Sequence, residues 1–177
     1  MNGVRLLLVA VFVSILGLSI GSGLIAIGLP RAFVPEFALL YVVFISFYVA
    51  SSYGTFLAFL CGLIVDISSG QLLGPWAGAF VLSYGAVSLI SDRIYVESGF
   101  SLVFVTILLT LFSHTVYLLI SVDPLTQLFS DWMVIVGKSF TTAFIAPLFF
   151  PLLRWMLSYS QVDSIRARGG SVYSIIF

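Results

Sequence analysis

The sequence predicts an all-α membrane protein: a bundle of six transmembrane helices, with five as the alternative. Of its 177 residues, 61% are hydrophobic and only 8% are charged, whereas a soluble domain carries about 25% charged residues. The mean hydropathy is +1.22, and the few charges separate uncharged stretches that are long enough to cross a bilayer, which takes about 20 residues. A chain so poor in charge cannot maintain an aqueous surface, so a soluble globular enzyme is excluded.

Composition also limits the partners. The formal net charge is zero, which argues against a nucleic-acid partner, because such partners are bound through basic surfaces. The single cysteine, Cys61, lies inside an apolar stretch and has no second cysteine with which to form an intrachain disulfide. We therefore interpret Cys61 as a small buried hydrophobic residue.

The first helix is predicted at about 6–29, between Arg5 and Arg31. A signal peptide would have a shorter apolar core, roughly 7–15 residues, and a small-residue cleavage site. Small residues do occur at 19–23, but apolar sequence continues to Leu29. We therefore expect an uncleaved first helix.

Residues 37–65 contain no charge and could form either one long helix or two short ones. A single helix of this length would measure about 44 Å and would have to tilt strongly in a core of about 30 Å. A cluster of small and polar residues at 50–54 divides the stretch instead into two short helices, at about 37–50 and 54–67. We favour two helices, since short helices are tolerated where neighbours cover them.

Three more helices complete the predicted domain at 1–159, at about 75–91, 99–121 and 131–159. Pro75 suits a first helical position, Asp123-Pro124 should end the fifth helix, and two prolines should kink the sixth. Residues 160–177 are expected to form a cytoplasmic tail.

Orientation follows from the positions of Lys and Arg near the helix ends. With six spans and a cytoplasmic N-terminus, five arginines are inside and only Arg31 is outside; the inner ones are Arg5, Arg93, Arg154, Arg166 and Arg168. Five spans with an outer N-terminus give the same ratio, so charge does not decide the number. Both alternatives place the tail and the Arg93 loop in the cytoplasm and the turn after Asp66 outside, where Arg93, Arg166 and Arg168 could contact cytoplasmic partners.

The sequence offers no catalytic constellation. It has no glycine-rich phosphate loop, no Cys/His cluster and no nucleophile elbow, and the only histidine cannot form a metal site alone. We therefore expect no enzyme, no cofactor and no metal. A lipid-handling enzyme is a further alternative, but Asp92, Arg93 and Glu97 are too sparse a set to hold lipid phosphates.

Ionisable side chains within the membrane are costly and often functional. His114 lies seven residues before the predicted end of the fifth helix, and Lys138 lies seven after the predicted start of the sixth. Both would sit about 10 Å from the outer end, where Asp66 ends the third helix. The three could share an outer polar pocket. Alternatively, Lys138 extends to the interface, His114 makes a neutral contact, and Asp66 marks a helix end.

Small residues recur along two predicted helices and could hold a partner's transmembrane helix at close range. The first stripe is Gly54, Ala58 and Gly62, and the second is Gly74, Gly78 and Gly85. Packing within the protein itself is the alternative for both.

The stretch around Asp66 resembles the MreD family, the multi-spanning subunit of the bacterial rod-shape machinery. The family pattern is an apolar helix that ends Gly-Leu-Leu-Leu-Asp, a Ser-Gly turn, and Leu-Gly opening the next helix. This sequence has Gly62 to Asp66, then Gly70, then Leu73-Gly74. Upstream, Pro35-Glu36-Phe37 is similar to the family's start of its second helix.

The resemblance implies a non-enzymatic subunit of the elongation complex in the bacterial inner membrane. Its implied partners are the bitopic protein MreC and, indirectly, RodA, a class B penicillin-binding protein and the MreB filament, besides membrane lipid. It also implies six spans and a fold similar to the substrate-binding subunits of energy-coupling-factor vitamin transporters. A transporter subunit holding a small ligand near Asp66, His114 and Lys138 is therefore the alternative function.

Overall fold

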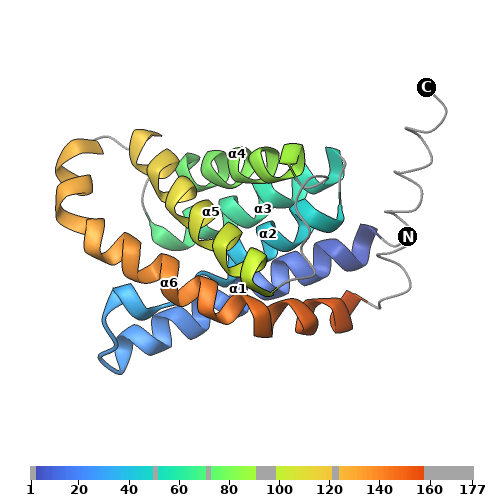
Figure 1. Cartoon of the computed structure of the whole chain (residues 1–177), viewed down its shortest axis with the longest axis horizontal. Coiled ribbons are helices and arrows are strands. Elements are labelled where there is room, and N and C mark those ends of the chain that lie inside the picture. Colours follow the sequence, from blue (N-terminus) through green and yellow to red (C-terminus); the bar gives the residue numbers. More distant parts are fainter. Residues whose placement is uncertain (1–2, 50–51, 71–72, 91–98, 121–123, 158–177) are drawn as a thin grey trace.

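The computed structural model describes residues 3–49, 52–70, 73–90, 99–120 and 124–157, and in this part of the chain it is a bundle of six α-helices (Figure 1). The order is α1 (Gly3–Ala26), the short 3-10 turn η1 (Arg31–Phe33), α2 (Phe37–Tyr48), α3 (Ser52–Ser69), α4 (Pro75–Ile90), α5 (Gly99–Ile120) and α6 (Pro124–Leu157). The predicted all-α bundle with six helices is confirmed. Five segments are long and apolar enough to cross a membrane, and α4 is a shorter apolar helix.

Helix α2 is the centre of the bundle. Its residues Leu39 to Ile45 are fully buried, and it contacts α1, α3, α4, α5 and α6. The Tyr41 hydroxyl donates a 2.8 Å hydrogen bond to the carbonyl of Leu6 on α1, which satisfies a phenol that has no access to water. Because other helices surround it on every side, α2 can be only 12 residues long without exposing backbone polar groups to lipid.

The uncharged stretch 37–65 does divide into two helices, as predicted. The helical conformation of α2 ends before Val49, which has φ −128°, and α3 starts at Ser52. The hydroxyl of Tyr84, on α4, donates to the carbonyl of Val49. A side chain from another helix thus satisfies backbone that the break leaves without a helical partner.

The start of α6 was predicted wrongly. The sixth helix begins at Pro124 rather than at residue 131, because proline without its N–H fits the first turn of a helix. It also remains one helix through Pro147 and Pro151 as it curves around the outside of the bundle (Figure 1). The other helices differ from the predicted bounds by three residues or fewer.

Contacts between the helix ends show that α1 starts and α6 finishes at the same end of the bundle (Figure 1). The Tyr53 hydroxyl, at the start of α3, donates to the carbonyl of Gly3. The Arg154 guanidinium, near the end of α6, donates to the hydroxyl of Tyr48 at the end of α2. A chain with an even number of passes would have this arrangement, and the six predicted spans stay a prediction.

Candidate functional site

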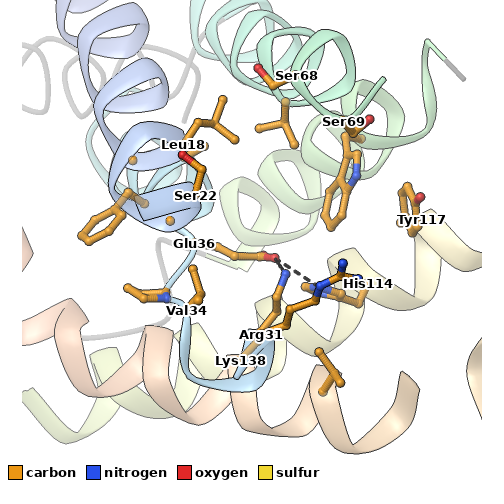
Figure 2. Close-up of a pocket in the computed structure, with 18 of the residues that line it drawn as sticks. Leu18, Ser22, Arg31, Val34, Glu36, Ser68, Ser69, His114, Tyr117 and Lys138 are labelled. Carbon is orange, nitrogen blue, oxygen red and sulfur yellow. Dashed lines mark hydrogen bonds and ion pairs between the residues drawn. The ribbon is translucent and has the colours of Figure 1, made fainter. Parts of the chain in front are cut away.

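Three ionisable side chains from distant parts of the chain meet on one carboxylate oxygen. Lys138 Nζ on α6 lies 2.9 Å from Glu36 Oε1, and His114 Nε2 on α5 lies 3.2 Å from the same oxygen (Figure 2). Glu36 is the residue that precedes α2. We call these three residues the Glu36 cluster. It joins the central helix to the two helices that pack most extensively on each other.

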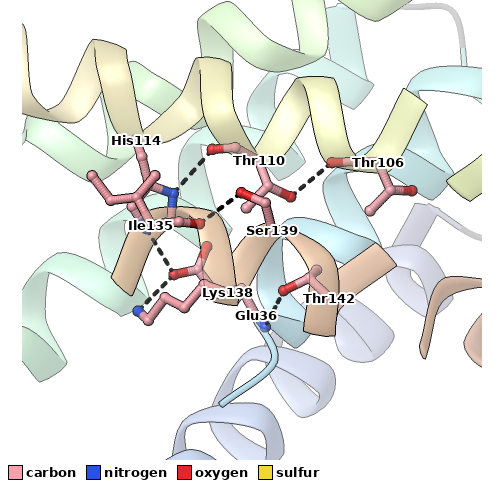
Figure 3. A network of polar contacts seen from close by, with 8 residues as sticks. All are labelled: Glu36, Thr106, Thr110, His114, Ile135, Lys138, Ser139 and Thr142. Carbon is pink, nitrogen blue, oxygen red and sulfur yellow. Dashed lines mark hydrogen bonds and ion pairs between the residues drawn. The ribbon is translucent and has the colours of Figure 1, made fainter. Parts of the chain in front are cut away.

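Backbone and hydroxyl contacts hold two members of the cluster, His114 and Glu36, in place (Figure 3). His114 Nδ1 is 3.0 Å from the carbonyl oxygen of Thr110, one turn earlier on α5. The backbone N–H of Glu36 donates to Thr142 Oγ1 on α6 at 3.1 Å. The ring of His114 is therefore oriented by its own helix, and the backbone of Glu36 is fixed by a side chain of α6.

The cluster is largely removed from solvent. The side chains of His114, Glu36 and Lys138 are 7%, 15% and 24% exposed. An isolated ion at such a position would cost several kcal/mol, and an oppositely charged partner within hydrogen-bonding distance offsets part of that cost. The pairing gives Lys138 a counter-charge at its position on α6.

The structure thus brings together two of the three residues predicted for the polar pocket, His114 and Lys138. The expectation that Asp66 supplies their negative charge is wrong. That charge comes from Glu36, which lies between Pro35 and the first residue of α2 and which we considered only as part of the pattern Pro35-Glu36-Phe37. The one signal was its position: an acid directly before a long uncharged stretch, within the Pro-acid-apolar pattern.

Asp66 has a different task at the corner between α3 and α4. Its carboxylate accepts backbone N–H groups of Gly74 at 2.9 Å, Trp76 at 3.0 Å and Ala77 at 3.1 Å. Its side chain is only 1% exposed. A carboxylate at a helix N-terminus satisfies free N–H groups and interacts favourably with the helix dipole. Asp66 therefore caps α4 from the last turns of α3.

The other motif residues shape the same corner, apart from Pro35. Gly70 and Gly74 have φ of +64° and +122°, values that residues with a Cβ rarely adopt. A Cβ on Gly62 would stand 2.5 Å from the Cα of Ala77, so only glycine lets α3 approach the backbone of α4. Pro35 is buried beside the Glu36 cluster.

The first small-residue stripe does not face outward. Gly54, Ala58 and Gly62 are buried, and a Cβ on Gly54 would stand within 3 Å of the Tyr84 hydroxyl. Gly54 and Gly62 contact α4, so the stripe serves packing inside the protein and is not available to a partner helix. This corrects the expectation of a partner surface on α3, because the close approach that small residues permit is used by α4.

The second stripe is divided. Gly74 lies in the turn, and a Cβ on Gly78 would stand 3.2 Å from Ile120 of α5. Gly85 has no atom within 4 Å of a Cβ position. Its neighbours on the outer side of α4, Leu82 and Leu89, are 53% and 84% exposed. Within the described residues, the outer face of α4 around Gly85 is therefore open to a neighbour.

A pocket of about 870 Å³ lies beside the Glu36 cluster (Figure 2). Its wall is formed by the C-terminal half of α1, the connection through η1, the end of α3, the start of α4, and parts of α5 and α6. Trp76 forms one side, stacked on Tyr117 at 4.4 Å and edge-on to His114 at 5.2 Å between ring centroids. Such a volume falls within the range of small-molecule sites, roughly 300–1,000 Å³.

Three residues predicted to make cytoplasmic contacts, Arg93, Arg166 and Arg168, lie outside the described residues. So does the predicted tail at 160–177. In the part of the chain that the structure describes, His, Cys, Asp and Glu side chains do not gather in groups of three that could hold a metal ion.

Comparison with known proteins identifies the family of the chain. The family model described as rod shape-determining protein MreD matches residues 3–157, a range that contains all six helices. None of the curated proteins and none of the solved structures compared with the chain matches it. The expected similarity to substrate-binding subunits of vitamin transporters therefore stays a prediction.

Proposed function

This chain belongs to the MreD family of rod shape-determining proteins, and on that premise we propose that it is a non-enzymatic subunit of the bacterial elongation complex. In this role it binds MreC and helps to organise sidewall peptidoglycan synthesis. The observation that carries the proposal is the family match, which runs from the first residue of α1 to the last of α6. A multi-pass membrane protein of this kind acts by positioning its partners.

The surface that we assign to MreC is the outer face of α4 around Gly85. Small residues on a helix let the backbone of a partner helix approach closely, and Gly85 is such a residue on the open face of α4. Helix α4 has only 16 residues, about 24 Å, so a partner helix beside it would also shield a span that is short for the bilayer. Contacts with RodA, the class B penicillin-binding protein and MreB are then indirect, and Arg93, Arg166 and Arg168 are the residues that we assign to the cytoplasmic side.

We place the protein in the inner membrane with both termini in the cytoplasm. The positive-inside rule supports this orientation, since it assigns five of the six arginines to the cytoplasm and only Arg31 to the outside. The Asp66 corner, the Glu36 cluster and the pocket then lie toward the outer face.

A mild-detergent pull-down of the tagged protein from native membranes, followed by mass spectrometry, tests the proposal. We expect MreC to be recovered with the wild type and to be lost with Gly85→Leu. Gly23→Leu on α1 is the matched control, since Gly23 also has nothing within 4 Å of a Cβ position. Recovery of no single-span partner from membranes that contain MreC would contradict the proposal, and equal loss with both variants would contradict the assigned surface.

The pocket supports a second candidate, the substrate-binding subunit of a vitamin-type transporter. A cavity of about 870 Å³ with charged and aromatic walls suits a small ligand. The same pull-down separates the two functions, because a transporter subunit would bring an ATPase module and a bound vitamin instead of MreC.

A further inference from the structure

The hydrogen bonds of the Glu36 cluster require one proton more than a neutral histidine and a charged carboxylate provide. His114 Nδ1 faces the carbonyl of Thr110 at 3.0 Å, and a carbonyl can only accept, so Nδ1 carries a proton. Nε2 faces Glu36 Oε1 at 3.2 Å. If neither Nε2 nor Oε1 carried a proton, a lone pair of the ring would face a lone pair of the carboxylate. With Lys138 charged, the three residues together hold one positive charge.

The remaining charges on the pocket wall are Arg31 and Asp131. Arg31 adds one positive charge and Asp131 one negative charge, so the wall keeps the single positive charge of the cluster. Arg31 is exposed, and no carboxylate among the described residues lies within salt-bridge distance of it. Its guanidinium is the one cation of the wall that is available to an incoming anion, as a planar donor that matches phosphate oxygens.

The surroundings of Arg31 indicate that the anion belongs to a lipid. Ile27 and Phe33, in the same connection between α1 and α2, are 81% and 58% exposed. Large apolar side chains beside a cation are typical of the zone where lipid headgroups meet acyl chains. The pocket wall itself is partly apolar, with Leu18, Ile25 and Phe37, and its volume exceeds that of a phosphate ion. A cationic end next to an apolar wall suits an amphiphile.

We propose that the pocket binds the phosphate-bearing headgroup of a membrane lipid. Arg31 contacts the phosphate, the Glu36 cluster supplies the positive field at the floor, and the apolar wall between α1 and η1 covers the first carbons of the chains. The cluster thus has a role beyond joining helices: it keeps the floor positive although it contains a buried carboxylate. This site is independent of the MreC surface on α4, because Gly85 does not line the pocket.

Native mass spectrometry of the full-length protein in dodecyl maltoside tests the site. Three probes are titrated: dioctanoyl phosphatidylglycerol, dioctanoylglycerol, which has the same chains without phosphate, and inorganic phosphate. We expect a one-to-one adduct with phosphatidylglycerol alone. Arg31→Gln should weaken it about tenfold, the value of one charge-assisted hydrogen bond. Arg5→Gln is the matched control, since Arg5 is also exposed and lies at the far end of α1.

A second variant fills the pocket without changing its charge. Ser22→Trp replaces a small lining residue of α1 and should abolish the adduct while the melting temperature stays at the wild-type value. Retention of full binding by both Arg31→Gln and Ser22→Trp would overturn the proposal. So would equal binding of dioctanoylglycerol, which would show that phosphate is not recognised, or binding of inorganic phosphate alone, which would show a site for a soluble anion.

Discussion

The contact between α3 and α4 predicts opposite effects for two alanine substitutions of glycine. Gly62 and Gly85 both lie within helices, on α3 and α4. A Cβ on Gly62 would stand 2.5 Å from the Cα of Ala77 and 2.6 Å from the carbonyl oxygen of Trp76. Ordinary van der Waals contact begins at 3.4 Å, and a Cβ on Gly85 would meet nothing within 4 Å.

Both substitutions gain helix propensity, but only Gly62→Ala also causes overpacking. Alanine gains about 0.5–1 kcal/mol over glycine within a helix. At Gly62 the added methyl meets helix backbone, which cannot rotate away, so overpacking should cost the upper part of the usual 1–3 kcal/mol. The same displacement would pull Ala77 from Asp66, whose carboxylate accepts its N–H at 3.1 Å. We expect Gly62→Ala to lose about 2–3 kcal/mol of unfolding free energy and Gly85→Ala to gain about 0.5–1 kcal/mol.

Reversible unfolding of both variants in mixed detergent and SDS micelles, followed by circular dichroism, measures the difference. Gly85→Ala serves as the control for helix propensity, because it introduces the same methyl group without a contact. If Gly62→Ala unfolds at the same SDS fraction as Gly85→Ala, the close approach of α3 and α4 is refuted.

Three further predictions concern polar contacts. Asp66→Asn leaves an amide where a carboxylate accepts three N–H groups, and thermal unfolding should show a loss of about 1–3 kcal/mol; unfolding like that of Ser68→Ala, an exposed position on the same helix, would contradict the capping role. Glu36→Gln should lower the free energy of unfolding by about 2 kcal/mol, which is less than the 3–5 kcal/mol lost when a fully buried ion pair is broken. Adding Lys138→Met to this variant should recover part of the loss. Strictly additive effects in this double-mutant cycle would show that the two side chains are not coupled. Tyr41→Phe removes the hydrogen bond to Leu6 and should cost about 1 kcal/mol, so an unchanged SDS midpoint would contradict that contact.

The helices could be predicted because the membrane imposes their spacing. Charged side chains are costly within the hydrocarbon core, so Arg5, Arg31 and Glu36 mark where helices begin and end. The small and polar residues at 50–54 identified the break between α2 and α3. The start of α6 was missed because Asp123-Pro124 is equally compatible with a loop and with the first residues of a helix.

The site could be predicted only in part because charge pairing depends on tertiary structure. The depth of His114 and Lys138 along their helices indicated that they lie at one level. Nothing in the spacing shows that Glu36, rather than Asp66, reaches them, because that choice depends on how the start of α2 is placed against α5 and α6. The same holds for the glycine stripes: Gly62 and Gly85 occupy similar patterns, yet one contacts α4 and the other faces outward.

Photo-crosslinking in living cells tests the proposed function most directly. A photoreactive amino acid replaces Leu82 on the outer face of α4 or Leu108 on α5, which are 53% and 51% exposed and therefore equally able to react with a neighbour. The account predicts a crosslink to MreC from position 82 and none from position 108. A crosslink from position 108 alone, or none to MreC from either position in cells that contain it, would contradict the account.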